Sequence, residues 1–171
     1  MGLATVLGGR PQGWFIPYRY AASAVPPPNY PELEPKFAAA EPDFAATLDA
    51  IDAFSEDLLR TGTDAPPQPR WTQSWFPRLD AAAAYAMVRT RAPARIVEVG
   101  SGHSTRFMAR AVRDGGLATK IVAIDPAPRA TIAALGVEHV AATVQTAPRA
   151  PFEALRPCHR GAGRELRSRS L

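Results

Sequence analysis

The segment Arg95-Ile-Val-Glu98-Val-Gly100-Ser-Gly102-His-Ser104 decides the fold of this chain. Its apolar residues Ile96, Val97 and Val99 predict a buried parallel strand. Two glycines one residue apart then allow a tight turn and a close approach of the backbone to a ligand. Ser104 is placed to cap the helix that follows. The segment therefore predicts a strand, a glycine turn and a helix whose free N–H groups face the turn.

A second apolar strand, Lys120-Ile-Val-Ala-Ile124, ends in Asp125, which lies 27 residues after Glu98. The carboxyl ends of neighbouring parallel strands meet at one edge of a sheet, so Asp125 is expected beside the glycine turn. An acid at this position can accept hydrogen bonds from both hydroxyls of a ribose. An alternative role for Asp125 is to cap a helix over 126–135. Together the two strands predict a site for a nucleoside-containing cofactor.

Helical and extended patterns alternate from residue 77 to residue 144. The expected order is helix 77–91, strand 96–99, helix 104–114, strand 120–124, helix 128–135 and strand 137–144. This order predicts an α/β fold, a partial Rossmann-like sheet of about three parallel strands with helices. The residues expected to face the core from the two longer helices are Leu79, Ala83, Ala86, Met87, Phe107, Met108, Ala111 and Val112.

A Pro- and aromatic-rich arm and a helix precede this alternation. Prolines in residues 1–36 disfavour regular structure, whereas Pro42 suits the first turn of a helix over 42–60. The apolar residues of that helix recur at helical spacing: Phe44, Leu48, Ile51, Phe54 and Leu58. The predicted organisation is therefore an arm and helical lead-in (1–65), the N-terminal half of a Rossmann-like domain (66–155) and a basic, disordered tail (156–171).

Composition excludes several classes of protein. The whole net charge of +4 lies in the tail, which has five arginines and one acid, and no aromatic pattern accompanies it, so we do not expect a nucleic-acid partner. No apolar run approaches the ~20 residues that span a bilayer. The single cysteine, Cys158, fits a reducing compartment, and the cytoplasm is the expected location. Cys158 and His159 lack a second ligand pair, so no metal site is predicted.

Three stretches carry a resemblance to a known family. They are Trp-Phe-Ile-Pro-Tyr-Arg-Tyr at 14–20, the aromatic run at 71–80 and Val-Glu-Val-Gly-Ser-Gly-His-Ser-Thr at 97–105. With Asp125 they resemble class I S-adenosylmethionine-dependent methyltransferases, and in particular a bacterial group of small methyltransferase domains. The resemblance covers about residues 13–155.

The resemblance implies a methyltransferase whose cofactor is S-adenosylmethionine and whose acceptor is a small molecule of unknown identity. It places the methionine part of the cofactor over Gly100 and Gly102, with Glu98 facing its amino end and Asp125 holding the ribose. The residues that it implies for cofactor binding are Glu98, Gly100, Ser101, Gly102, His103, Ser104, Asp125, Thr143 and Val144. No residue is assigned as a catalytic base.

Other roles stay open for several of these residues. The two glycines serve equally to pack a helix closely on a strand, and His103 serves as a base, lines the cofactor pocket or bonds to the backbone. His139 is expected to be a partly exposed structural residue. Trp71 and Trp75 either wall the acceptor pocket or pack on the sheet.

The family continues into further strands after the position of Pro157, but residues 158–171 show no strand pattern. We interpret this as a frameshift near codon 157, so that the chain is expected to be an inactive form truncated after the third strand. Strand 96–99 would then become an edge available for self-association.

Two rival functions remain. A glycine pair followed by an acid also marks NAD-dependent Rossmann oxidoreductases, although Thr105 stands where they have a third glycine and Glu98 precedes the first. The other rival is a non-catalytic interaction remnant that uses its exposed sheet edge.

Overall fold

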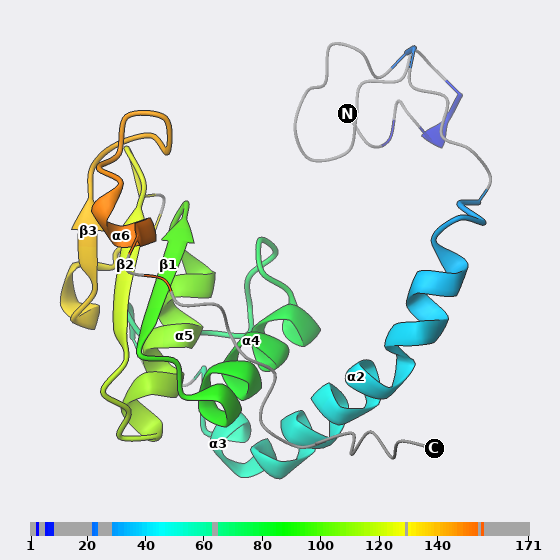
Figure 1. Ribbon diagram of the computed structural model, residues 1–171, viewed down its shortest axis with the longest axis horizontal. Helices are drawn as coiled ribbons and strands as arrows, with labels where there is room; N and C mark the ends of the chain where they lie inside the picture. Colours follow the sequence, from blue (N-terminus) through cyan, green and yellow to red (C-terminus); the bar gives the residue numbers. More distant parts are fainter. Residues whose placement is uncertain are drawn as a thin grey trace, which may run out of the picture. The chain divides into compact units, whose positions relative to one another are not determined.

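The computed structural model describes residues 29–62, 65–128, 130–153 and 155, together with residues 3, 6–8, 22 and 23. The chain divides into two compact units, Met1–Glu41 and Pro42–Leu171, and the second carries the sheet (Figure 1). The aromatic stretch at 14–20 and the predicted tail at 156–171 lie outside the described residues.

The sheet has three parallel strands in the described part of the chain: β1 (Arg95–Val99), β2 (Lys120–Ile124) and β3 (Glu138–Val140). Their spatial order is β1-β2-β3, with Val97 of β1 paired to Val122 of β2 (Figure 1). Parallel neighbours joined through helical or irregular crossovers are typical of a Rossmann-like arrangement. The predicted α/β fold with a partial parallel sheet is therefore confirmed.

Burial differs between the strands because β2 is central. Residues 121–124 of β2 are all buried, whereas Ile96 and Val97 of β1 are half-buried and Val99 is 58% exposed. Within the described residues, β1 has a hydrogen-bonded neighbour on one side only. The prediction of a buried strand at 96–99 is thus wrong, and the prediction that this strand forms an edge is confirmed.

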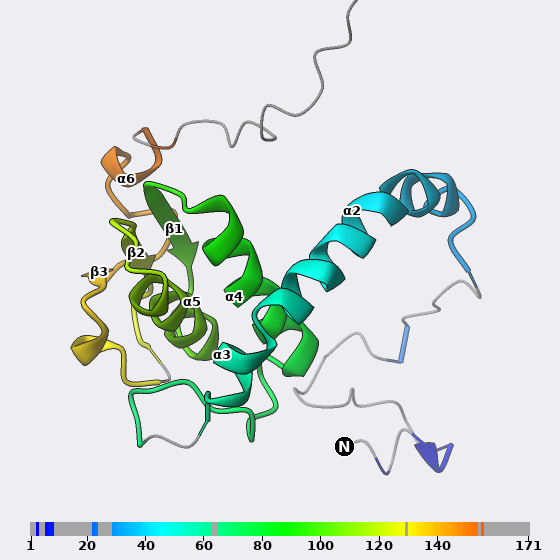
Figure 2. The same cartoon turned by 90° about the horizontal axis from the view of Figure 1, so that it is seen from below.

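Helices α4 (Arg78–Arg91) and α5 (His103–Asp114) pack against one another (Figures 1 and 2). Phe107 and Ala111 of α5 are fully buried, while Met108 and Val112 of the same helix pack against the core. The inward face predicted for this helix is confirmed. Gly115 ends it, as the glycine pair at 115–116 predicted.

The inward face predicted for α4 is wrong in part. Leu79 and Met87 are exposed, and the buried residues of this helix are Ala81, Ala82, Tyr85, Ala86 and Val88. Tyr85 explains the difference, because its aromatic ring enters the core while its hydroxyl reaches Asp114 at the end of α5. The prediction considered only apolar residues at helical spacing, so it left out a tyrosine whose ring is buried.

The lead-in helix begins earlier than predicted. α2 spans Glu34–Ala53 and α3 spans Ser55–Leu59, with a break at Phe54. Pro35, rather than Pro42, occupies the tolerated first turn, and Pro42 lies inside α2. Only the second half of the predicted stripe reaches the core. Ile51, Phe54 and Leu58 pack there, whereas the earlier members, Phe44 and Leu48, are exposed.

Two predictions after β2 are wrong. The helix expected at 128–135 is reduced to the single 3₁₀ turn η1 (Ala133–Leu135), and the Thr131 carbonyl accepts hydrogen bonds from the Arg106 guanidinium instead of from a helical N–H. The third strand ends at Val140 rather than at residue 144. The Val140 carbonyl accepts from the N–H groups of both Asp125, over 3.0 Å, and Ala142, over 2.8 Å, so the chain turns there. A short helix, α6 (Ala150–Glu153), follows.

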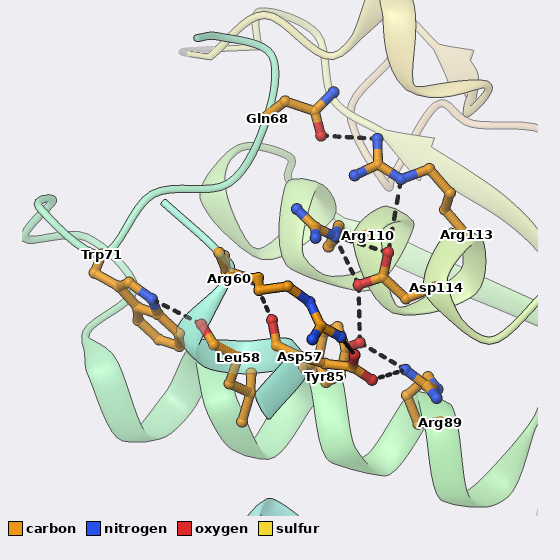
Figure 3. A network of polar contacts seen from close by, with 11 residues as sticks. Asp57, Leu58, Arg60, Gln68, Trp71, Tyr85, Arg89, Arg110, Arg113 and Asp114 are labelled. Carbon is orange, nitrogen blue, oxygen red and sulfur yellow. Dashed lines mark hydrogen bonds and ion pairs between the residues drawn. The ribbon is translucent and has the colours of Figure 1, made fainter. Parts of the chain in front are cut away.

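A network of polar side chains joins α3, α4 and α5 (Figure 3). Tyr85 Oη donates to Asp114 Oδ2 over 2.9 Å, and Arg89 Nη1 donates to Asp57 Oδ2 over 2.8 Å and to Tyr85 Oη over 2.6 Å. Arg110 Nε also donates to Asp114 Oδ2, over 2.6 Å. Each buried or half-buried charge in this network thus has an opposite charge beside it, which offsets the cost of its removal from water.

Candidate functional site

The turn between β1 and α5 is built around two glycines with open space beside them. The Gly100 N–H donates to the Ile124 carbonyl over 2.9 Å, so the pairing of β1 with β2 continues into the turn. The backbone of Gly100 has a φ of +87°, in the left-handed region that favours glycine. A Cβ added at Gly100 or at Gly102 would meet no atom within 4 Å. Close packing therefore does not require glycine at these two positions, and a ligand can approach the backbone there.

Asp125 lies next to this turn, as predicted. Ser101 Oγ donates to Asp125 Oδ2 over 2.8 Å, and the Ala127 N–H donates to Asp125 Oδ1 over 2.8 Å. Burial alone would raise the pKa of Asp125, but the hydrogen bonds from Ala127 and Ser101 outweigh it and lower the pKa. The predicted helix is absent here, so Asp125 caps the turn after β2 rather than a helix. It is a charged carboxylate at the tip of the central strand.

Glu98 bonds to the start of α5. The hydroxyl of Ser104 donates to Glu98 Oε1 and that of Thr105 donates to Glu98 Oε2. Burial raises the pKa of Glu98, the two hydroxyl bonds oppose that rise, and the charge of Asp125 adds to it. The electrostatic influence of Asp125 on Glu98 follows from the proximity of two carboxylates at neighbouring strand ends.

The predicted capping role of Ser104 is wrong. Gly102 is the N-cap residue of α5, and Ser104 lies inside the first turn with its hydroxyl directed to Glu98. The side chain that satisfies the helix start is Thr105, whose Oγ1 accepts from the Gly102 N–H over 2.9 Å and donates onward to Glu98. The acid before the glycine turn therefore holds the helix through two hydroxyls.

His103 begins α5 and lies near positive rather than negative charge. Its pKa is lowered first by burial and then by the charges of Arg106 and Arg70. Its Nδ1 is buried and has no hydrogen-bond partner among the described residues. His139 of β3 is exposed, and its Nε2 lies 2.7 Å from the Asp125 carbonyl oxygen. The structural role expected for His139 agrees with this contact.

Thr143 and Val144 lie in an exposed turn after β3. The Thr143 carbonyl accepts from the N–H groups of Thr146, over 3.0 Å, and Ala147, over 2.9 Å. Both residues follow the carboxyl end of β3, on the same edge of the sheet as Asp125, because the strands are parallel. In the described part of the chain, no hydrogen bond joins them to the glycine turn or to Asp125.

A cavity of about 340 Å³ lies between the segment after β2 and β3. Its lining consists of Pro128, Ala130, Thr131, Ile132, Ala133, Val137 and His139. None of the residues predicted to bind the cofactor lines this cavity, although Asp125 immediately precedes the segment that forms one wall. The predicted site is instead the open surface over the glycine turn.

The two tryptophans of the lead-in differ in position. The ring of Trp71 lies 4.9 Å from that of Phe107, and its Nε1 donates to the Leu58 carbonyl over 3.3 Å (Figure 3). Trp71 therefore packs in the core, whereas Trp75 is exposed.

Comparison with protein-family models, curated proteins and solved structures gave no match. Among the described residues, no helix is both long and apolar enough to cross a membrane. The same residues contain no group of three or more side chains that could ligate a metal ion.

Two residues of this region were missed by the sequence analysis. Thr105 links the glycine turn to Glu98. The sequence feature that could have indicated this role is a hydroxyl residue at the position where dinucleotide-binding folds have a third glycine. Arg106 is buried beside the Thr131 carbonyl, and it carries no sequence signal because arginine is common on helix surfaces.

Proposed function

We propose that this chain binds S-adenosylmethionine at the carboxyl ends of β1 and β2 and is a methyltransferase of the class I type. The observation that carries the proposal is the hydrogen bond from Ser101 to Asp125, which joins the glycine turn to an ionised acid. A ribose has two adjacent hydroxyl donors, and a carboxylate at a strand tip accepts from both.

The residues present fit the methionine and ribose parts of the cofactor. Gly100 and Gly102 leave the space over the turn open, so a ligand can lie on the peptide groups. Glu98 would face the cationic amino group of the ligand, and Asp125, whose pKa is lowered, would accept hydrogen bonds from its ribose. The cofactor would supply an activated methyl group bound to sulfur. The protein's part is to hold that group in line with the acceptor, an unidentified small molecule, and no general base is assigned.

Calorimetry with S-adenosylhomocysteine tests the proposal directly. The full chain is expected to bind this ligand, and Asp125→Asn is expected to weaken binding by about tenfold or more, because a charge-assisted hydrogen bond becomes a neutral one. Asp52→Asn is the matched control, since Asp52 is an exposed acid on α2. Absence of binding by the unmodified chain, or equal loss in both variants, would contradict the proposal.

The oxidoreductase alternative is less well supported. Thr105 occupies the position of the third glycine, is fully buried and uses its hydroxyl to link Gly102 with Glu98. In dinucleotide-binding folds that glycine permits close packing of the helix on the strand. Titration with NADH in the same calorimetric assay separates the two functions, because only an oxidoreductase would bind it.

The interaction alternative rests on a different observation. β1 has a free edge within the described residues, and Val99 at its end is exposed. A free edge of this kind pairs readily with another strand. Self-association without binding of S-adenosylhomocysteine would favour this alternative.

A further inference from the structure

Among the residues that the structure describes, Arg106 is a buried cation with a single hydrogen-bond partner. Its side chain belongs to the second turn of α5, and the residue is 4% exposed. Nε and Nη2 donate to the Thr131 carbonyl over 3.2 Å and 3.1 Å. A neutral carbonyl leaves the positive charge uncompensated, and a buried charge of this kind is costly unless an anion lies beside it.

Two other arginines of the same unit each form an ion pair with a carboxylate. Arg110, one helical turn further along α5, forms an ion pair with Asp114 at 2.6 Å. Arg89 of α4 pairs with Asp57 at 2.8 Å. Within the described part of the chain, no carboxylate bonds to Arg106. Arg106 therefore differs from its neighbours in charge balance, although all three are at least largely buried.

The groups around Arg106 add positive charge or donor capacity. His103 lies three residues before it, on the same face of α5, and its buried Nδ1 has no hydrogen-bond partner in the described part of the chain. The charge of Arg70, from the segment before α4, acts on both His103 and Arg106 and, with burial as the larger cause, lowers the pKa of each. Like charges gathered in this way repel one another unless an anion lies among them.

We propose that Arg106 and His103, three residues apart on α5, form a binding site for an oxyanion, the phosphate or carboxylate group of a small molecule, and that the positive charge of Arg70 strengthens it. A planar guanidinium matches the oxygens of either group, and an imidazole adds a donor that is strongest when protonated. Nη1 of Arg106 and Nδ1 of His103 bond to no other side chain or backbone group among the described residues, and both can donate to an anion.

His103 directly follows Gly102 of the glycine turn, but the guanidinium of Arg106 does not bond to Glu98. Ser104 and Thr105 direct their hydroxyls to Glu98, whereas Arg106 directs its guanidinium to Thr131 in the segment after β2. The test of the anion site uses no cofactor, so its outcome can be distinguished from that of the proposed function.

Nuclear magnetic resonance of the His103 imidazole in the full chain tests the proposal. The chain is titrated with sodium phosphate and, in a separate arm, with sodium acetate, at constant ionic strength in chloride. A saturable shift of the His103 signals and a rise in the pKa of His103 are expected, since a bound anion stabilises the imidazolium. Tighter binding of phosphate assigns the site to phosphate esters, and tighter binding of acetate assigns it to carboxylates.

Substitutions distinguish binding of the anion at this site from a nonspecific effect of salt. Arg70→Gln is expected to weaken binding by about tenfold, because the site loses a nearby positive charge. Arg106→Gln is expected to abolish the saturable shift. Since Arg70 is exposed, its variant remains informative if the Arg106 variant does not fold. Arg91→Gln is the matched control, an exposed arginine at the end of α4.

Three results would overturn the proposal. The first is a linear, non-saturating response to both anions in the unmodified chain. The second is an unchanged affinity in Arg70→Gln, and the third is an equal loss in Arg91→Gln, because a nonspecific electrostatic effect depends only on net charge.

Discussion

Ser101 Oγ donates a hydrogen bond to Asp125 Oδ2 over 2.8 Å and so ties the turn after β1 to the tip of β2. The bond fixes the orientation of a carboxylate whose other oxygen accepts from the Ala127 N–H. Asp125 is thereby held in one orientation at the end of the central strand. The contact joins the two strand ends on which the proposed cofactor site depends.

Loss of this hydroxyl is expected to weaken the binding of S-adenosylhomocysteine. In Ser101→Ala the carboxylate of Asp125 loses a donor that lowers its pKa, and its orientation then depends on the Ala127 N–H. We expect a loss in affinity of up to about tenfold, the usual worth of one hydrogen bond, measured by calorimetry. Ser74→Ala removes an exposed hydroxyl elsewhere and is expected to change nothing. An affinity of Ser101→Ala equal to that of the control would argue against an orienting role.

Alanine substitutions of two glycines at opposite ends of α5 distinguish the cost of backbone strain from the exclusion of a ligand. Gly100 has a φ of +87° and Gly116 a φ of +57°, and an added Cβ meets no atom within 4 Å at either position. Alanine at each is expected to lower the free energy of unfolding by about 1–2 kcal/mol, the cost of a left-handed backbone for an L-residue, as measured by urea denaturation. Only Gly100→Ala is expected to weaken S-adenosylhomocysteine binding as well, because its methyl group enters the space over the turn. Equal binding by the two variants would count against a ligand there.

The pH dependence of binding is expected to report on Glu98. Burial raises the pKa of this carboxyl above its ordinary value of 4.5, so lowering the pH through the raised pKa neutralises it. S-adenosylhomocysteine carries a cationic amino end, which 5′-methylthioadenosine lacks. We therefore expect the affinity for the first ligand, measured by calorimetry at a series of pH values, to fall with the pH while that for the second stays constant. Parallel profiles for the two ligands would show that Glu98 does not face the amino end.

The same raised pKa bears on stability. The folded state of an acid with a raised pKa holds its proton more firmly than the unfolded state, so the contribution of Glu98 to stability is fully present below pH 4.5 and declines as the pH rises through the folded pKa. Glu98→Gln is expected to remove this decline from the pH profile of urea denaturation. Retention of the full decline in the variant would assign it to another group.

The hydroxyl of Tyr85 is expected to stabilise the packing of α4 on α5. Tyr85 is fully buried, its Oη donates to Asp114, and it accepts from Arg89 (Figure 3). Tyr85→Phe keeps the ring and leaves these charged partners with one fewer bond. We expect a loss of about 1–3 kcal/mol in the free energy of unfolding. Tyr30→Phe, at an exposed position, is the control and is expected to be neutral.

The free edge of β1 is expected to support self-association. Sedimentation should reveal dimers or larger species that increase with protein concentration, since an unpaired strand is a template for another. Val99→Lys places a charge at this edge and is expected to reduce association. Leu59→Lys is the matched control, because Leu59 is also an exposed apolar residue but lies at the end of α3. If only Leu59→Lys reduced association, the interface would have to lie near α3 rather than at β1.

Local sequence determined the elements around the glycine turn. Strand residues 95–99 and 120–124, helix α5 and the position of Asp125 all follow from short-range apolar periodicity and from glycine and acid positions. Parallel pairing of β1 with β2 then required only a crossover helix between them. These are properties of contiguous residues, so the amino-acid order alone was enough to predict them.

Tertiary contacts decided the remaining features. The helix expected at 128–135 is missing where the Thr131 carbonyl bonds to Arg106, and β3 ends at Val140 where that carbonyl bonds to Ala142 and Asp125. Tyr85 sets the buried face of α4 because its hydroxyl reaches Asp114, 29 residues away along the chain. Glu98 meets two hydroxyls of α5 that no strand pattern indicates. In each case the partner is distant in sequence or on another element, and its hydrogen bond outweighs a local preference worth only a fraction of a kcal/mol per residue.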